Sequence, residues 1–424
     1  YPDRTVHTGL LEYKNVYRPA RVVSYDKESG ELVLHNYMDF DDLKDYVKIS
    51  YELTQDGLVI SKGKLAEVSV APHSEGKISL NINVPENGKC YLKLIYQLKK
   101  EMPLLEKDHI LGFDEIEVSQ KDAKCQLAEK WLEKTSADSE LQVNENDTQI
   151  HIKGREFAYT IDRRTALFTE MKFAGREYLN HPMELNIWRA PTDNDMYIKS
   201  EWRKAHYDKA YTRAYTTEVV QGKHGVKITS HASVVAETVQ KILDVTITWT
   251  IDAAGKIDAD IEATKDGEFP DLPRFGVRMF LDKKLADVRY FGMGPQESYR
   301  DKHQAASHGL YRANIGDLHE DYIRPQENGS HYDCEYVELN NSRYGIVASA
   351  EKAFSFNASY YTQEELEKKT HNYELTESDS VVFCVDYALN GIGSNSCGPV
   401  VLDQYRFNDV LFRFQFTLVP YVKG

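Results

Sequence analysis

Apolar and polar residues alternate along most of the chain, and a period of two is the signature of half-buried β-strands. The alternation is clear over residues 78–84, stops at the turn sequence "PENG", and resumes over 92–98. We interpret these two segments as a hairpin-like pair. Residues 243–251 and 257–263 show the same pattern on either side of the turn sequence "DAAG", which predicts a second pair.

A further strand is expected over 412–418, where alternate positions are Phe, Phe, Phe and Leu. Strands that bury one face and expose the other are typical of antiparallel sandwiches. Helix signals are few. The clearest is "TQEELEKKTH", in which Thr362 and Glu365 have the spacing of a capping box, with acids early and lysines late. A weaker helix is expected over 121–134.

A polar stretch divides the chain into two parts. Residues 133–148 are rich in Ser, Asp, Glu and Asn and poor in large apolar residues, as linkers are. The short strands before it amount to about 100 residues, the size of an immunoglobulin-like sandwich. The longer strands after it would form one large β-sandwich. The prediction is an all-β chain of two domains.

Composition narrows the classes of partner. The chain has 424 residues, 41% of them hydrophobic, and a formal net charge of −15. This balance argues against nucleic acid and against an anionic membrane surface as partners. No apolar run is long enough to span a membrane. The start has neither Met nor an apolar signal segment, and it suggests a piece of a longer polypeptide.

Cysteine usage indicates the compartment. The chain has five cysteines, which are widely spaced and form no Cys-x-x-Cys motif. Free thiols in a reducing environment are the simplest interpretation, so we expect a cytoplasmic protein.

Two glutamates occupy a repeated Pro-Gln-Glu sequence. Glu297 lies in "GMGPQESYRD" and Glu327 in "RPQENGS". A glycosidase needs two facing carboxyl groups, one as acid and one as nucleophile or base. The neighbouring Gly-Pro and Asn-Gly pairs instead favour tight turns, where a carboxylate accepts backbone N–H groups or pairs with an arginine. Structural, catalytic and sugar-binding roles all stay open at this point.

Other polar clusters suggest no metal site. Residues 193–195, Asp-Asn-Asp, resemble the start of a calcium loop but lack its further acidic ligands and glycine. His303, His308 and His331 lack zinc-site spacing. The glycine-rich segment "NGIGSNSCGP", residues 390–399, is not a phosphate-binding loop, because it lacks the Gly-Lys-Ser/Thr ending. It is either a plain connection or a loop that reaches a ligand.

Four of these motifs in this order carry a family resemblance. "WRAPTDND", "GMGPQESYRDK", "RPQENGSHYDC" and "NGIGSNSCGP" resemble the C-terminal part of large bacterial β-galactosidases of glycoside hydrolase family 2. The opening "YPDRTVHTGLLEYKNVYRPARV" looks like the exit from that family's catalytic barrel. The similarity covers essentially the whole chain and is strongest from about residue 140 onward.

The resemblance implies an arrangement of domains. Residues 1–20 would be the exit segment from a missing catalytic barrel, 21–120 an immunoglobulin-like sandwich, 121–140 a linker, and 141–424 a galactose-mutarotase-like supersandwich. The catalytic acid and nucleophile of the family lie at the ends of barrel strands, so this chain would contain no catalytic residue and would be inactive alone. Its cofactors, Mg²⁺ and Na⁺, would be bound largely outside it.

The resemblance also implies contacts near the active site. In some members the loop matching residues 390–399 carries a tryptophan that stacks on the substrate. Here Trp249 is the last tryptophan, so Asn395, Ser396 and Cys397 would line the entrance with a smaller apolar face. The other candidate sugar-binding or structural residues within the motifs are Arg189, Asp193, Asn194, Asp195, Glu297, Tyr299, Asp301, Glu327 and Asn328. Glu335 stands where relatives are expected to have arginine.

The expected partners are therefore the N-terminal, barrel-containing portion of the same protein, a β-galactoside, and further copies in a homo-oligomer. Two alternatives stay open. One is a free-standing mutarotase-like epimerase, with Glu297 or Glu327 as base and His303 or His331 as acid. The other is a carbohydrate-binding module.

Overall fold

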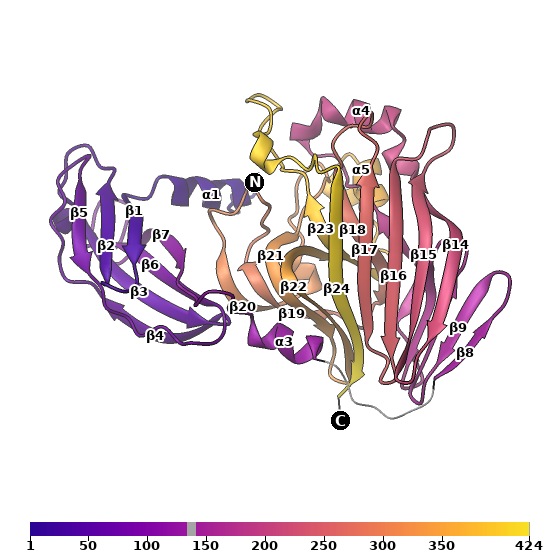
Figure 1. The fold of residues 1–424 in the computed structure, drawn as a ribbon. Helices are drawn as coiled ribbons and strands as arrows, with labels where there is room; N and C mark the ends of the chain where they lie inside the picture. Colours follow the sequence, from indigo (N-terminus) through magenta and orange to yellow (C-terminus); the bar gives the residue numbers. More distant parts are fainter. Residues whose placement is uncertain (134–140, 424) are drawn as a thin grey trace. The chain divides into compact units, whose positions relative to one another are not determined.

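The computed structural model describes residues 1–133 and 141–423, which form two compact units (Figure 1). The first unit contains residues 1–127 together with two later segments, 291–296 and 303–311. Sequence analysis placed those later segments in the second domain. The second unit contains the rest of the chain. Residues 134–140 of the expected linker lie outside the described residues.

The first unit is a sandwich of two antiparallel sheets. One sheet has the order β1-β2-β5 and the other β4-β3-β6-β7. Leu32 and Leu34 of one sheet and Ile49, Leu92 and Leu94 of the other belong to one buried apolar cluster. The elements are α1 (Thr8–Val16), β1 (Ala20–Asp26), β2 (Glu31–Asn36), α2 (Leu43–Tyr46), β3 (Val47–Gln55), β4 (Leu58–Lys64), β5 (Glu75–Ser79), β6 (Cys90–Leu98) and β7 (Ile110–Glu117). The immunoglobulin-like sandwich is confirmed.

The expected pairing of residues 78–84 with 92–98 is wrong. β5 ends at Ser79 and pairs with β2, whereas β6 pairs with β3 and β7. The two segments therefore lie in different sheets. Alternation shows that a strand has a buried face, but it does not identify the neighbouring strand. The turn between the two segments carries the chain from one sheet to the other.

The second unit contains most of the long strands. The remaining helices and 3₁₀ turns are α3 (Gln126–Leu132), η1 (Asp193–Asp195), α4 (Ile198–Lys204), η2 (Tyr207–Lys209), η3 (Ile315–Leu318), α5 (Gln363–Lys368), η4 (Asn372–Glu374) and η5 (Asp403–Tyr405). The remaining strands are β8 (Gln142–Glu145), β9 (Gln149–Lys153), β10 (Phe157–Asp162), β11 (Leu167–Phe173), β12 (Arg176–Glu177), β13 (Leu179–Asn186), β14 (Tyr211–Gln221), β15 (Gly225–Val235), β16 (Leu243–Asp252), β17 (Ile257–Lys265), β18 (Arg274–Asp282), β19 (Asp287–Gly294), β20 (Ser307–Asn314), β21 (Ser330–Asn340), β22 (Tyr344–Ser359), β23 (Ser380–Leu389) and β24 (Leu411–Val422).

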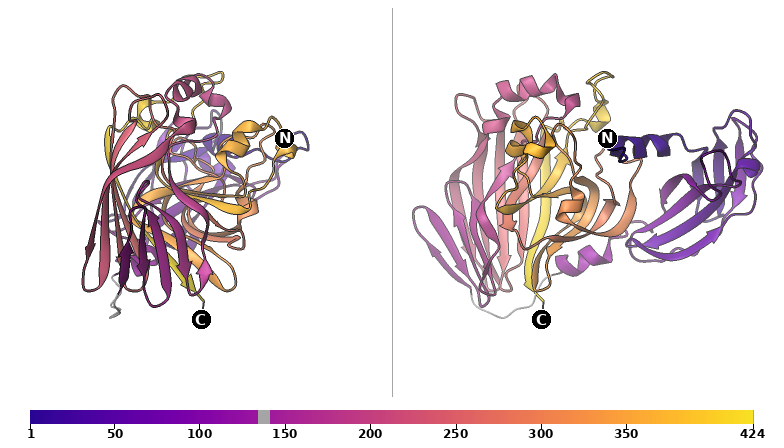
Figure 2. Two further views of the ribbon diagram at one scale, coloured as in Figure 1. Left: turned by 90° about the vertical axis from the view of Figure 1, so that its right-hand side faces the viewer. Right: turned by 180° about the vertical axis from the view of Figure 1, so that it is seen from behind.

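These strands form a five-stranded sheet, β12-β11-β10-β9-β8, and a twelve-stranded sheet. The main path of the larger sheet is β13-β18-β23-β22-β24-β17-β16-β15-β14, with β21 beside β22 and β19 beside β20 and β21. Figure 1 shows β14 to β17 and β24 side by side, and Figure 2 shows the same strands from the side and from behind. The all-β class is confirmed.

The predicted pair of strands near residue 250 is confirmed as the hairpin β16–β17, which is in register from Leu243 opposite Lys265 to Ile251 opposite Ile257. The predicted strand with the aromatic face is β24. Trp249, on β16, is fully buried and donates its indole N–H to the carbonyl oxygen of Ala166 at 2.8 Å. The alternate apolar positions of 243–251, 257–263 and 412–418 are buried, so the prediction that these strands bury one face is confirmed.

The helix predicted at "TQEELEKKTH" is confirmed as α5. The Thr362 hydroxyl accepts from the backbone N–H of Glu365 at 3.1 Å, and the Glu365 carboxylate accepts from the backbone N–H of Thr376. The weaker helix begins later than expected, at α3, because Asp122 has a φ of 61°, outside the helical region. In the parts of the chain that the structure describes, no helix is long and apolar enough to cross a membrane.

Candidate functional site

A buried ion pair joins two of the loops singled out by sequence. Arg189, in the loop after β13, is fully buried, and its Nε and Nη2 donate to the two carboxylate oxygens of Asp195 at 3.1 and 2.7 Å. Its Nη1 donates to the carbonyl oxygen of Asn390 at 2.5 Å, and its Nη2 also donates to that of Gly391 at 3.1 Å. Burial alone would lower the pKa of Arg189, but Asp195 raises it, so the guanidinium stays charged.

Two further side chains hold the backbone of the glycine-rich loop. The Asn194 amide donates from Nδ2 to the carbonyl oxygen of Gly393 at 2.6 Å and accepts at Oδ1 from the N–H of Ser396 at 3.3 Å. The Asp301 carboxylate accepts from the N–H groups of Ile392 and Gly393 at 2.9 and 2.7 Å. Together with Arg189, these side chains fix the loop from 390 to 396. We call this arrangement the loop clamp.

The tip of the clamped loop reaches solvent. Asn395 is half-buried, whereas Ser396 and Cys397 are exposed. The tip is closed by a turn of its own, in which the N–H groups of Cys397 and Gly398 donate to the carbonyl oxygen of Ser394 at 3.3 and 2.7 Å. The expected role of residues 395–397 at an active-site entrance stays a prediction.

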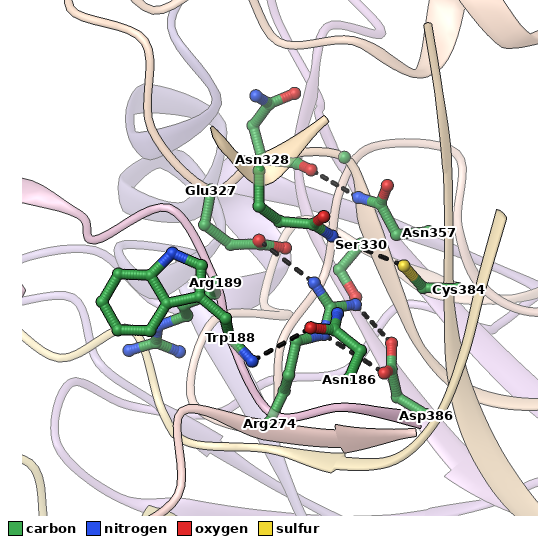
Figure 3. Close-up of polar contacts among 12 residues, drawn as sticks. Asn186, Trp188, Arg189, Arg274, Glu327, Asn328, Ser330, Asn357, Cys384 and Asp386 are labelled. Carbon is green, nitrogen blue, oxygen red and sulfur yellow. Dashed lines mark hydrogen bonds and ion pairs between the residues drawn. The ribbon is translucent and has the colours of Figure 1, made fainter. Parts of the chain in front are cut away.

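Glu327 belongs to a second buried charge network (Figure 3). Figure 3 shows the Arg274 guanidinium between the carboxylates of Glu327 and Asp386. Arg274 Nη1 lies 3.3 Å from Glu327 Oε2, and Arg274 makes two bonds to Asp386. Among the described residues, Glu327 Oε1 has no hydrogen-bond partner. Burial raises the pKa of Glu327 to about 7 against the opposing effect of Arg274 and Arg189.

Glu297 is also buried but is held by different groups. Its carboxylate accepts from the ammonium of Lys302, the hydroxyl of Tyr322 and the N–H of Gly329, the last at 2.8 Å. Burial opposes its ionisation, but these three donors hold the pKa of Glu297 below its usual value. Tyr299 is buried beside the two glutamates, and burial followed by their charges raises its pKa.

The two remaining candidates are engaged in loop contacts. Asn328 accepts at Oδ1 from the N–H of Glu320 at 3.0 Å and donates from Nδ2 to the carbonyl oxygen of Gln326 at 2.9 Å. Asp193 exchanges two hydrogen bonds with the Gln326 side chain, at 3.0 and 3.2 Å. The structure thus links the motif around residue 190 to the second Pro-Gln-Glu motif.

Sequence reasoning missed Arg274 and Asp386, which lie on β18 and β23. A signal was present for Asp386, which is the single charged residue in the apolar strand "VVFCVDYAL". It was weaker for Arg274, which begins a strand, "RFGVRMFLD", that has two further charged residues. Charged residues are almost never fully buried unless they are paired.

The histidines and acids form no metal cluster within the described residues, where no group of three or more His, Cys, Asp or Glu side chains could hold an ion. His331 is buried and stacks on Phe356, with ring centroids 5.0 Å apart. His308 contacts Glu115, with Nδ1 2.7 Å from Oε1. Glu335, on β21, is buried.

Comparison with known proteins gives the family. Residues 153–418 match the model of the β-galactosidase small chain, and residues 32–119 match that of β-galactosidase domain 4. The chain therefore belongs to the β-galactosidase small-chain family. It corresponds to a C-terminal part of a β-galactosidase.

Two relatives illustrate the match. A β-galactosidase from Actinobacillus pleuropneumoniae is 44% identical over 420 residues, which are 99% of this chain and 40% of that protein. One from Staphylococcus xylosus is 31% identical over 99% of this chain and 41% of that protein. The chain thus spans about 40% of the length of these relatives and is part of a larger protein. Among solved structures, a galactose 1-epimerase from Lactobacillus acidophilus aligns with 68% of this chain and all of its own, at 10% identity and a TM-score of 0.36.

Proposed function

We propose that this chain is the non-catalytic C-terminal part of a β-galactosidase. The complete protein hydrolyses terminal non-reducing β-D-galactose residues with retention of configuration. The observation that carries this proposal is the family match over residues 153–418, together with relatives named β-galactosidase that are about two and a half times as long as this chain. The acid, the nucleophile and the Mg²⁺ and Na⁺ ions belong to the remainder of the protein.

The contribution of this chain is to support the catalytic portion and to line its entrance with Asn395, Ser396 and Cys397. The loop clamp supports this role, because a loop whose backbone is already fixed loses little conformational entropy when a substrate arrives. Arg189, Asn194 and Asp301 then act as positioning residues and do not themselves touch substrate.

The partners in this proposal are the barrel-containing portion of the same protein and further copies of it. Glu297, Tyr299, Glu327 and Asn328 support the loops from within. The cysteines are free thiols, which fits a reducing, cytoplasmic setting.

Activity on a chromogenic β-galactoside tests the proposal. The chain is assayed alone and after mixing with the separately produced N-terminal portion of its parent. We expect no hydrolysis by the chain alone and hydrolysis after it is mixed with the N-terminal portion. Turnover by the chain alone that disappears in Glu297→Gln or Glu327→Gln would overturn the proposal. So would an N-terminal portion that is fully active without this chain. Polarimetry of α-D-galactose with the chain alone checks for mutarotation, which we expect to be absent.

A further inference from the structure

The strand β22 changes its partner halfway along its length. Residues 344–349 pair with β24, and residues 355–359 pair with β23. Residues 350–354 lie outside both of these registers, and three of them, 351–353, are exposed. The sheet therefore splits at this point, because β21 pairs with one edge of β22 along both halves, and β23 and β24 each pair with one half of the other edge.

A second irregularity lies opposite the split. The pairing of β21 with β22 shifts register on both sides of Cys334, and the preceding Asp333 has a φ of 55°. Register shifts of this kind redirect side chains and are over-represented next to functional sites. A left-handed conformation at a residue other than glycine costs free energy that the surrounding structure must offset.

A cavity lies where the two irregularities meet. It has a volume of about 220 Å³ and is lined by Arg300, Tyr332, Asp333, Ala353 and Tyr387, among others. A larger groove of about 600 Å³ lies over β24, β17, β16 and β15, and shares Ala353 and Tyr387 with the cavity. The cavity is of a size for one sugar ring, and the groove offers room for a chain attached to that ring.

The cavity combines an aromatic face with hydrogen-bonding groups. The Tyr387 ring is held in place by stacking on Phe412, with centroids 5.0 Å apart and an interplanar angle of 15°. Tyr332 and Tyr387 are protonated at neutral pH, as phenols ordinarily are, and their hydroxyl groups can donate hydrogen bonds. Arg300 and Asp333 add a charged donor and a charged acceptor.

The charges of the cavity and the groove balance. The cavity is lined by one cation, Arg300, and one acid, Asp333. The groove is lined by three cations and three acids, namely Lys227, Lys352, Arg413, Asp258, Asp260 and Glu351. Such a surface has no net attraction for an anion, and several of its charged groups are already paired, as Arg413 is with Asp260. An apolar ligand would remove water from these polar groups without offering hydrogen bonds in return. A neutral ligand rich in hydroxyl groups satisfies both conditions.

We propose that this hollow is a carbohydrate-binding site, in which the cavity holds one hexose ring and the groove holds the next units of a neutral oligosaccharide. The site goes beyond the proposed function, which assigns sugar contact only to residues 395–397. It does not depend on whether the complete protein hydrolyses galactosides.

Isothermal titration calorimetry on the 424-residue chain tests the site, with methyl β-D-galactopyranoside and a β-1,4-linked galactotetraose as probes. We expect both to bind, the tetraose more tightly. Asp333→Gly removes the carboxylate and keeps a residue suited to the positive φ. It is expected to weaken binding of both probes by about tenfold or more, as loss of a charged hydrogen-bond partner does. Arg413→Ala, in the groove, is expected to weaken binding of the tetraose alone.

The matched control is Asp122→Gly, because Asp122 is an exposed aspartate with a φ of 61° that lies outside the cavity and the groove. It is expected to leave binding unchanged. Thermal unfolding of each variant checks that the fold is kept. Tyr332→Phe is a second, milder substitution in the cavity, which removes only one hydroxyl group. Absence of binding by the unmodified chain would overturn the proposal. Equal affinities in the unmodified chain, Asp333→Gly and Tyr332→Phe would also overturn it.

Discussion

Arg189 and Asp195 lie six residues apart and face each other through two parallel hydrogen bonds, with side chains that are 0% and 4% exposed. The remaining donors of Arg189 reach carbonyl oxygens of a loop about 200 residues away in sequence. The pair is therefore a connection between loops as well as a local contact. Removing either partner leaves the other charge buried without compensation.

Asp195→Ala is expected to lower the free energy of unfolding of the larger unit by about 3–5 kcal/mol, because it strands the Arg189 guanidinium. Urea unfolding followed by tryptophan fluorescence measures the change. Glu201→Ala is the control, since Glu201 pairs with Lys204 where both side chains are more than half exposed. That substitution should change stability by less than about 1 kcal/mol. Equal losses of unfolding free energy in Asp195→Ala and Glu201→Ala would show that the buried ion pair stabilises the unit no more than the exposed pair does.

Asp301→Ala is expected to speed hydrogen exchange at the amides of Ile392 and Gly393 by roughly tenfold to a hundredfold, because both donate to the lost carboxylate. Asn194→Ala should speed exchange at Ser396 by a smaller factor. Exchange followed by mass spectrometry or NMR measures both. Asp403→Ala, at a position whose side chain is 90% exposed, serves as the control. Unchanged protection in Asp301→Ala would contradict the loop clamp.

The sequence predicted elements better than it predicted neighbours. The hairpin β16–β17 was predictable because its strands are adjacent in sequence and joined by a four-residue turn. The segments at 78–84 and 92–98 have an equally short connection, but they enter different sheets. The choice between the two outcomes depends on packing with β2 and β3, which lie far away in the chain. Local patterns carry no information about those partners.

The pKa of Glu327 gives stability a distinctive pH dependence. Its pKa is about 7 in the folded state, against an ordinary value of 4.5. Between these values the folded state keeps a proton that the unfolded chain has released, so this group makes stability fall as pH rises from about 4.5 to 7. Glu327→Gln mimics the protonated form. The stability of this variant relative to the unmodified chain should therefore rise across that range, by on the order of 3 kcal/mol.

Urea unfolding of both proteins at several pH values between 5 and 8 measures this difference. A difference that is constant with pH would contradict the assignment. The comparison cancels the contributions of groups that titrate equally in both proteins.

Glu297 should behave in the opposite way. Because Lys302, Tyr322 and Gly329 hold its pKa below 4.5, its contribution to stability is present above pH 4.5 and is lost as pH falls through the lowered value. Glu297→Gln is therefore expected to destabilise the chain at pH 7, by about 1–3 kcal/mol, and to have a smaller effect near pH 3. The same unfolding measurements test it. A penalty that grows on acidification would show that the carboxylate is not stabilised as an anion.

The contrast between the two glutamates was beyond the reach of the sequence. Both follow Pro-Gln, and both were expected in tight turns. What separates them is which charged groups the rest of the fold brings near. Lys302 lies five residues from Glu297 and could have been guessed, whereas Arg274 comes to Glu327 from a distant strand. Electrostatic environment is a property of tertiary structure, and a repeated motif does not ensure a repeated role.

The loop clamp also has a practical consequence. Of the five cysteines, four are buried, and the exposed one, Cys397, lies at the tip of a loop whose base is fixed by Arg189, Asn194 and Asp301. A maleimide dye would therefore attach at one known position without any engineered residue. Its emission would report directly on whatever covers the loop tip when the remainder of the protein assembles around it.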